Sequence, residues 1–199
     1  NPSPTQPMPS GTFIPGDAVD GNVQPLAVIG ADSRVRVTDT TVSPNSAVVF
    51  IVFYRGTTPY ICSGSIIAPQ YVLTAGHCAY ESGVYSTNFY IYPGINGADI
   101  PFGYRTATAA YIPPIWISTA TGNFNNSNLD YDWALLKLNS PVSASIQPFA
   151  VGTYSNTFLT SGVNFTDAGY PGDKCRYSGD VVTYCPPVGS SQGILGNGD

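Results

Sequence analysis

Short runs of β-branched and aromatic residues, separated by glycine and proline turns, constrain this fold more than any other feature of the sequence. No long amphipathic helix pattern occurs, and the first strong run, residues 46–54, is apolar on both faces. The spacing is typical of antiparallel β-barrels. A second group of strands is expected from Ile146, with residues 164–169 as its clearest member. Further strands of the first group are predicted at residues 60–67, 71–74, 89–92, 106–112 and 133–138.

Composition and charge exclude several classes of protein. The formal net charge is −5, and the seven basic residues are scattered, so there is no phosphate-neutralising patch for nucleic acid. No apolar run is long enough to span a bilayer, so no membrane partner is expected. The low charged fraction of 10%, the acidic balance and the even number of cysteines favour a secreted, extracellular protein.

The four cysteines fall into two close pairs. This spacing suggests Cys62–Cys78 and Cys175–Cys185 bridges, although four cysteines permit three connectivities. No C-x-x-C motif occurs and the chain has one histidine, so no metal and no other cofactor is expected.

The segment Leu73-Thr-Ala-Gly-His-Cys78 carries the strongest chemical signal. It resembles the histidine turn of the trypsin-like serine peptidases, and residues 62–67 resemble the strand that bridges to this turn. The resemblance implies that His77 is the catalytic base. His77 is the only histidine, so no other side chain could do this near neutral pH. The alternative is an ordinary surface or capping histidine.

A second segment, residues 130–138, is similar to the family's aspartate strand, Asp-x-Ala-Leu-Leu. This pattern selects Asp132 rather than Asp130. A carboxylate at Asp132 would accept the Nδ1–H of His77 and stabilise the imidazolium. Taken without the histidine motif, Asp132 would be interpreted as a turn residue at the entry to a strand.

Further residues narrow the resemblance to the glutamyl endopeptidase branch, which cleaves after Glu and sometimes Asp. Residues 28–37 resemble the mature amino terminus of that branch, with Val28 as the candidate first residue, and agreement continues to Lys174. In that branch the free terminal amine helps to bind the acidic substrate side chain. A Val28 still joined to Ala27 therefore implies a zymogen, or a relative that does not use this device. The Cys175–Cys185 pair departs from the branch pattern.

The resemblance implies an all-β fold of two antiparallel six-stranded barrels, the second incomplete in this chain. Residues 1–27, rich in proline and glycine, are predicted to be an N-terminal extension or propeptide lying over the surface, or else a disordered tail. Residues 28–142 would form the N-terminal barrel, and residues 143–199 the first part of the C-terminal barrel.

The nucleophile has no recognisable motif in the sequence. The chain ends on Gly198-Asp199, the pair that commonly precedes the serine of the family, so the serine is expected as the next residue. A C-terminal fragment of the same precursor would then be a partner that carries it. Ser191, in Gly-x-Ser-x-Gly, is the alternative, but no helix pattern follows it as this motif requires.

The expected function is a secreted serine endopeptidase that hydrolyses peptide or protein substrates through an acyl-enzyme. The alternative is a catalytically inactive homologue that acts as a binding or regulatory protein. A hydrolase that uses Ser191 is a third and lesser hypothesis.

Overall fold

The computed structural model describes residues 14–15, 34–97, 99–120, 128–159, 161, 164–172, 176–178, 181–184, 188–190 and 193–194. Its elements up to the end of the barrel are β1 Ile14–Pro15, β2 Arg34–Arg36, η1 Asn45–Ala47, β3 Val48–Arg55, β4 Thr58–Ala68, β5 Tyr71–Thr74, α1 Gly76–Ala79, β6 Tyr80–Glu81, β7 Val84–Tyr85, β8 Thr87–Pro93, β9 Arg105–Tyr111, α2 Pro114–Thr119, η2 Leu129–Tyr131 and β10 Ala134–Leu138. The later elements are α3 Asn156–Leu159, β11 Asn164–Phe165, β12 Ala168–Gly169, β13 Arg176–Ser178, β14 Val181–Tyr184, β15 Val188–Ser190 and β16 Gly193–Ile194.

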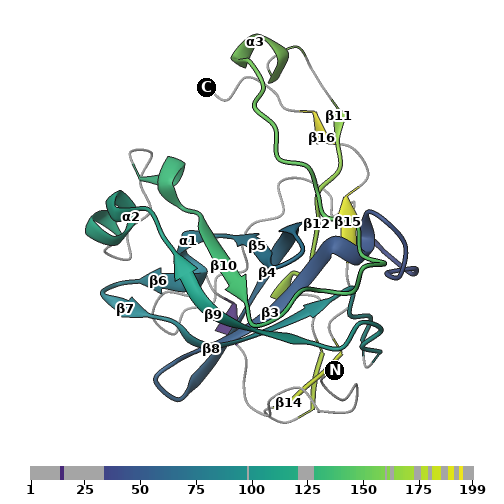
Figure 1. Cartoon of the computed structure of the whole chain (residues 1–199), viewed down its shortest axis with the longest axis horizontal. Coiled ribbons are helices and arrows are strands. Elements are labelled where there is room, and N and C mark those ends of the chain that lie inside the picture. Colours follow the sequence, from purple (N-terminus) through teal and green to yellow (C-terminus); the bar gives the residue numbers. More distant parts are fainter. Residues whose placement is uncertain are drawn as a thin grey trace.

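Six strands form a closed antiparallel barrel (Figure 1). They pair in the order β4-β3-β8-β9-β10-β5, and β5 pairs back with β4. Closure gives each of these strands a neighbour on both sides, which removes the exposed sheet edges that invite aggregation. The all-β class and one six-stranded barrel are confirmed, whereas the second barrel and the domain boundaries remain predictions.

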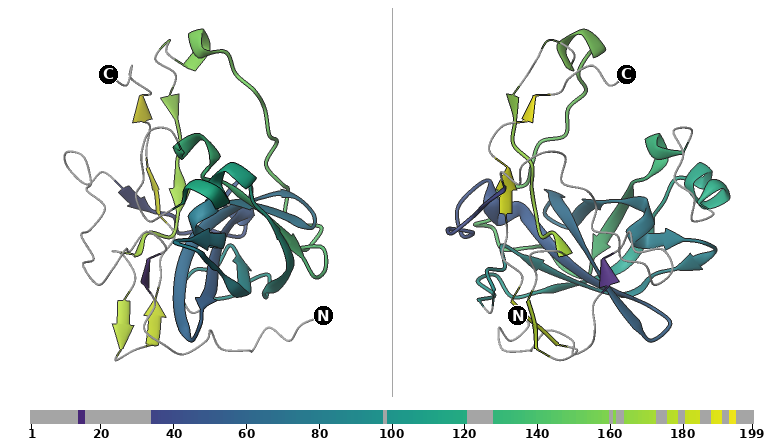
Figure 2. Two further views of the ribbon diagram at one scale, coloured as in Figure 1. Left: turned by 90° about the vertical axis from the view of Figure 1, so that its left-hand side faces the viewer. Right: turned by 180° about the vertical axis from the view of Figure 1, so that it is seen from behind.

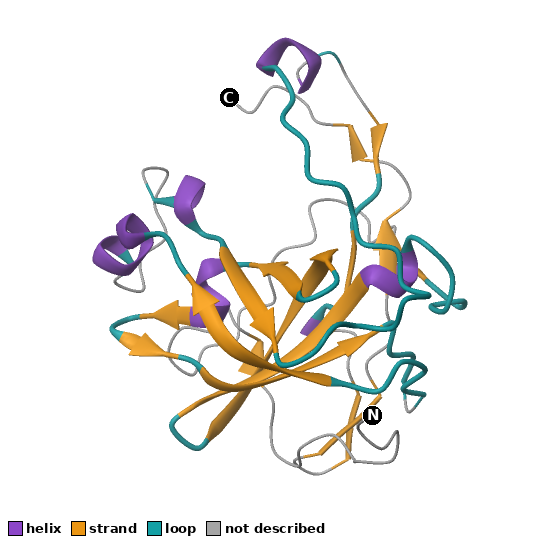
Figure 3. Ribbon diagram, in the orientation of Figure 1, coloured by secondary structure: helices purple, strands orange, loops and turns teal. Residues whose placement is uncertain are grey.

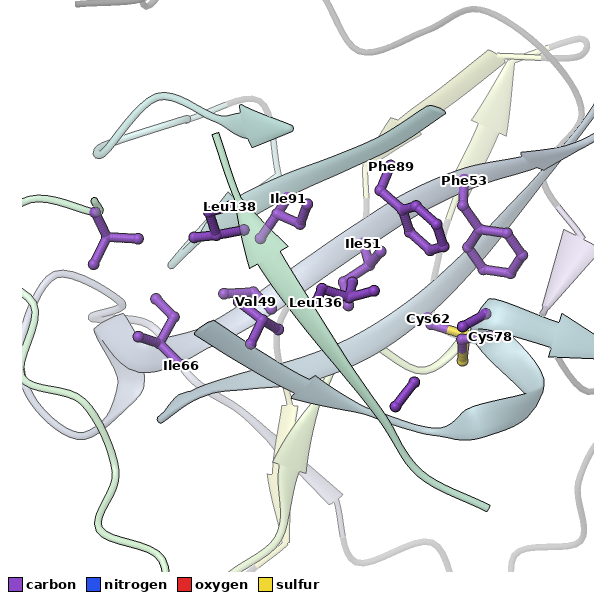
Figure 4. Close-up of a cluster of buried hydrophobic side chains, with 14 of the residues drawn as sticks. Val49, Ile51, Phe53, Cys62, Ile66, Cys78, Phe89, Ile91, Leu136 and Leu138 are labelled. Carbon is purple, nitrogen blue, oxygen red and sulfur yellow. A yellow bond between two sulfur atoms is a disulfide. The ribbon is translucent and has the colours of Figure 1, made fainter. Parts of the chain in front are cut away.

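Strand β3 is buried on both faces, which explains its continuous apolar sequence. Val49, Ile51 and Phe53 belong to the cluster inside the barrel, where side chains from facing strands meet (Figure 4). The intervening residues, with Phe50 at the centre, belong to a second cluster on the outer face. There the Phe50 ring lies 5.5 Å from the ring of Tyr170, which directly follows β12. The outer face of β3 therefore packs against the later segment, residues 164–194.

The later strands lie beside the barrel (Figure 2). They pair antiparallel, and the largest group has the order β12-β15-β2. The backbone N–H of Tyr170 donates to Ser63 Oγ at 2.8 Å, and the Tyr170 hydroxyl donates to the carbonyl oxygen of Ile95 at 2.9 Å. These two bonds tie the start of the later segment to β4 and to the loop after β8.

The described helices are short and lie outside the barrel (Figure 3). Helix α2, with six residues, is the longest of α1, α2 and α3. Among the described residues no helix has the length and apolar character needed to cross a membrane.

The structure corrects two sequence predictions. Residues 164–169 are not one strand but two, because β11 pairs with β16 and β12 pairs with β15. The two residues between them, Thr166 and Asp167, are exposed and polar, so they offer nothing to bury at that point. The second strand group also does not begin near Ile146, since the described residues between Leu138 and Asn164 form loop and α3.

One contact bears on the predicted N-terminal extension. Strand β1 pairs in parallel with β4, where Ile14 faces Tyr60 and Pro15 faces Ile61. This places two residues of the extension against the barrel. Val28, the candidate mature terminus, lies outside the described residues.

Candidate active site

Antiparallel pairing brings His77 and Asp132 to the same end of the barrel. Thr74, the last residue of β5, pairs with Ala134, the first residue of β10. Because the strands run in opposite directions, the residues that follow β5 lie next to those that precede β10. His77 lies in the α1 turn directly after β5, and Asp132 lies just before β10. Residues 55 positions apart in sequence are therefore neighbours.

Both oxygens of the Asp132 carboxylate contact His77. The Nδ1 atom of the imidazole lies 2.8 Å from Oδ2, and the main-chain N–H of His77 donates to Oδ1, also at 2.8 Å. Each of the two side chains is only 14% exposed. The carboxylate thus fixes both the ring and the backbone of His77. With Nδ1–H donated to Asp132, Nε2 is the proton-accepting nitrogen of the neutral ring.

Electrostatics favour the ionised form of Asp132. Burial raises the pKa of this carboxyl, but the hydrogen bonds and charge of His77, together with the Gly76 N–H, outweigh burial and hold the pKa below its ordinary value of 3.8. Asp132 is therefore a carboxylate at neutral pH, as an acceptor for the imidazole must be. Asp130, by contrast, is exposed in η2.

A disulfide anchors the turn that carries His77. Cys78, the next residue, is bonded to Cys62 of β4, with 6.4 Å between the two Cα atoms. In the described part of the chain, the only three potential metal ligands that lie close together are Cys62, His77 and Cys78. The two sulfurs are bonded to each other, so this group does not offer the thiolates that a zinc site needs.

A buried tryptophan, Trp116, supports the same region from outside the barrel. Trp116 is 1% exposed and packs with Tyr80 and Ala120. Its indole N–H donates to the carbonyl oxygen of Tyr80 at 2.8 Å. Helix α2 is thereby held against the chain that leaves the histidine turn.

Sequence reasoning missed a buried ion pair next to His77. Arg55, the last residue of β3, has a side chain that is only 10% exposed, and it pairs with Glu81, which is 5% exposed. The guanidinium also donates to the carbonyl oxygen of His77. The available signal was weak: Glu81 is the only glutamate of the sequence, and an arginine ends an otherwise apolar strand.

Other predicted site residues lie outside the described part of the chain. These are Val28, Cys175, Cys185, Ser191 and Asp199. The Cys175–Cys185 bridge and the position of the nucleophile stay predictions.

A closed β-barrel with a histidine and an aspartate joined at one end, beside a disulfide, defines the class of trypsin-like proteins. Comparison with known proteins agrees. Residues 37–184 match the sequence family described as trypsin, and the chain belongs to this family.

Two curated relatives come from Bacillus species. A glutamyl endopeptidase of Bacillus licheniformis is 37% identical over 150 residues, which is 74% of this chain and 43% of the relative. A protein of Bacillus subtilis named extracellular metalloprotease is 30% identical over 155 residues, 76% of this chain and 47% of the relative. The chain thus spans less than half the length of either relative. The relationship to glutamyl endopeptidase, predicted from sequence, is confirmed.

Solved structures agree with this relationship. A Glu endopeptidase in complex with MPD has a TM-score of 0.69 and 28% identity, with 87% of this chain and 73% of that chain covered. The protease Anisep from Arthrobacter nicotinovorans has a TM-score of 0.59 and 27% identity, with coverage of 80% and 67%.

Proposed function

We propose that the protein is a secreted serine endopeptidase that hydrolyses peptide bonds through an acyl-enzyme, with a preference for Glu or Asp before the scissile bond. The observation that carries the proposal is the contact between Nδ1 of His77 and Oδ2 of Asp132 at 2.8 Å. Acid preference is supported by the relative named glutamyl endopeptidase, and secretion by the relative named extracellular metalloprotease.

His77 and Asp132 have distinct roles in this mechanism. Nε2 of His77 takes the proton of a serine hydroxyl as the oxygen attacks the substrate carbonyl, and the imidazolium then protonates the leaving amine. Asp132 holds Nδ1–H and stabilises the positive ring while that proton is in place. The nucleophile is the serine expected after Asp199, with Ser191 as the alternative.

The proposal is tested on the natural, full-length protein with a fluorophosphonate probe. We expect labelling of one serine, loss of labelling in His77→Ala, and identification of that serine by peptide mass spectrometry. Ser191 as the labelled residue would replace the expected nucleophile but keep the mechanism. A folded protein that never labels, even after residues 1–27 are removed, would instead be an inactive homologue with a binding or regulatory role.

Substrate preference needs a separate measurement. Paired peptides that differ only by Glu or Gln before the scissile bond have the same shape and differ in charge. We expect kcat/KM to favour the Glu peptide, and equal values would contradict the acid preference while leaving the peptidase proposal intact.

A further inference from the structure

We infer that Arg55 and Glu81 form a positioning pair for His77, which holds the main-chain carbonyl of the base while Asp132 holds its main-chain N–H. The effect of this pair on catalysis rests on the proposed function. Its effect on the position of His77 rests only on the contacts of Arg55.

The Arg55 guanidinium uses its nitrogens on three different partners. Nη1 donates to Glu81 Oε2, Nη2 donates to the carbonyl oxygen of His77, and Nε donates to Ser86 Oγ at 3.2 Å. The guanidinium carbon also lies 4.8 Å from the ring centroid of Tyr60. A planar fork in which every nitrogen is used is a fixed group, unlike the flexible ammonium of lysine.

The buried charge of Glu81 keeps Arg55 in place. Glu81 is 5% exposed, and its Oε1 atom has no hydrogen-bond partner among the described residues. A buried carboxylate must be paired with a cation, because removal of the partner leaves an uncompensated charge in a medium of low dielectric constant. The attraction to Oε2 therefore fixes the guanidinium, and through Nη2 the guanidinium fixes the His77 carbonyl.

His77 is thereby held at both of its backbone polar groups. Its N–H donates to the Asp132 carboxylate, an anion, and its C=O accepts from Arg55, a cation. Hydrogen bonds to charged groups are about twice as strong as neutral ones. They fix the two peptide planes that flank His77 and hence the axis about which its side chain turns. A misplacement of about 1 Å in a catalytic group costs roughly 10²-fold in rate.

Four variants distinguish the effect of the Arg55 charge, the effect of its guanidinium geometry, and the effect of losing any arginine that binds main-chain carbonyls. Arg55→Met removes the fork, and Arg55→Lys keeps the charge but not the geometry. Glu81→Gln keeps the shape of the partner without its charge. Arg105→Met is the matched control, since Arg105 also donates to main-chain carbonyls, of Tyr104 and Pro141, but does not contact His77.

Two readouts follow His77 itself in the full-length protein. His77 is the only histidine of these 199 residues, and in ¹⁵N-histidine NMR its imidazole is assigned by the signal that disappears in His77→Ala, so the shifts of its Nδ1 and of the Nδ1 proton report the Asp132 bond directly. Peptide hydrolysis then gives kcat and KM separately. For Arg55→Met we expect about a 10²-fold lower kcat with KM within twofold, and a shifted or exchange-broadened Nδ1–H signal. The kcat of Arg55→Lys should lie between those of Arg55→Met and the wild type. Arg105→Met should have the kcat and the Nδ1–H signal of the wild type.

The outcomes distinguish this inference from the proposed function. Wild-type kcat and an unmoved histidine signal in folded Arg55→Met would overturn the inference. If Arg55→Met does not fold, the double variant Arg55→Met/Glu81→Met removes both charges together, and wild-type kcat there overturns it equally. A wild type that hydrolyses no peptide, with a histidine signal that moves in Arg55→Met, sinks the proposed function and leaves the positioning pair standing.

Discussion

Replacing Asp132 by asparagine tests the proposed mechanism at its most sensitive point. The carboxylate faces two donors, the main-chain N–H of His77 at Oδ1 and the ring Nδ1–H at Oδ2. An amide has one oxygen and one NH₂, so it can accept only one of these two bonds. If the NH₂ faced the main-chain N–H, two donors would oppose each other at a cost of about 1–3 kcal/mol. The amide oxygen is therefore expected to keep the backbone bond.

The NH₂ group then faces Nδ1 and forces the wrong tautomer of His77. Nδ1 becomes the acceptor, Nε2 carries the proton, and the ring cannot take the proton of the serine. In Ser-His-Asp enzymes this change lowers kcat by about 10⁴-fold, equivalent to roughly 5 kcal/mol in activation free energy. We expect the same loss in Asp132→Asn, with little change in KM.

The assay combines peptide hydrolysis with ¹⁵N NMR of His77, whose signal is assigned by its loss in His77→Ala and whose two nitrogen shifts report the tautomer. Asp130→Asn is the matched control, because Asp130 is exposed and is replaced by the same amide. Activity of Asp132→Asn within tenfold of wild type, or an equal loss in Asp130→Asn, would refute the reasoning.

Three further predictions concern stability, each measured by urea unfolding. Loss of the Cys62–Cys78 bridge, which joins residues 16 apart, should destabilise the fold by about 3 kcal/mol, and an unchanged midpoint in the double alanine variant would contradict this. Because the pKa of Asp132 is lowered in the fold, its ionisation contributes stability that is present above the ordinary value of 3.8 and is lost as the pH falls through the lower folded value. The wild type should therefore lose more free energy of unfolding than Asp132→Asn between pH 5 and pH 2. Equal losses in the two proteins would contradict this prediction. Tyr170→Phe removes the hydroxyl that donates to the Ile95 carbonyl and should cost about 1–2 kcal/mol, whereas a neutral effect would mean that water replaces the bond.

The barrel strands could be predicted from the sequence because each strand has a hydrophobic pattern within its own residues. Strand β10 alternates buried and half-buried residues, and β3 is apolar from Val48 to Phe53 because both of its faces are covered there. His77 and Asp132 could be located because each lies in a short local motif. The physical signal in these cases lies within a few consecutive residues.

Arg55 could not be found in this way, since its role depends on residues that only the folded chain brings near. Its partners Glu81 and the His77 carbonyl are 26 and 22 positions further along the chain. The division of residues 164–169 into two strands likewise depends on two different partner strands. The local sequence around each residue does not indicate which distant residue or strand it will pair with.

An enzyme that cuts after glutamate always has one substrate at hand, namely other copies of itself. Glu81, in strand β6, is the only glutamate of this sequence, and it is 5% exposed. Within these 199 residues a folded copy thus has no exposed glutamyl bond, and exposed aspartates such as Asp130 are the bonds that the proposed preference leaves open to cleavage. Self-digestion at Glu81 then requires that the β6 segment first open, so at a given enzyme concentration its rate falls as the stability of that region rises.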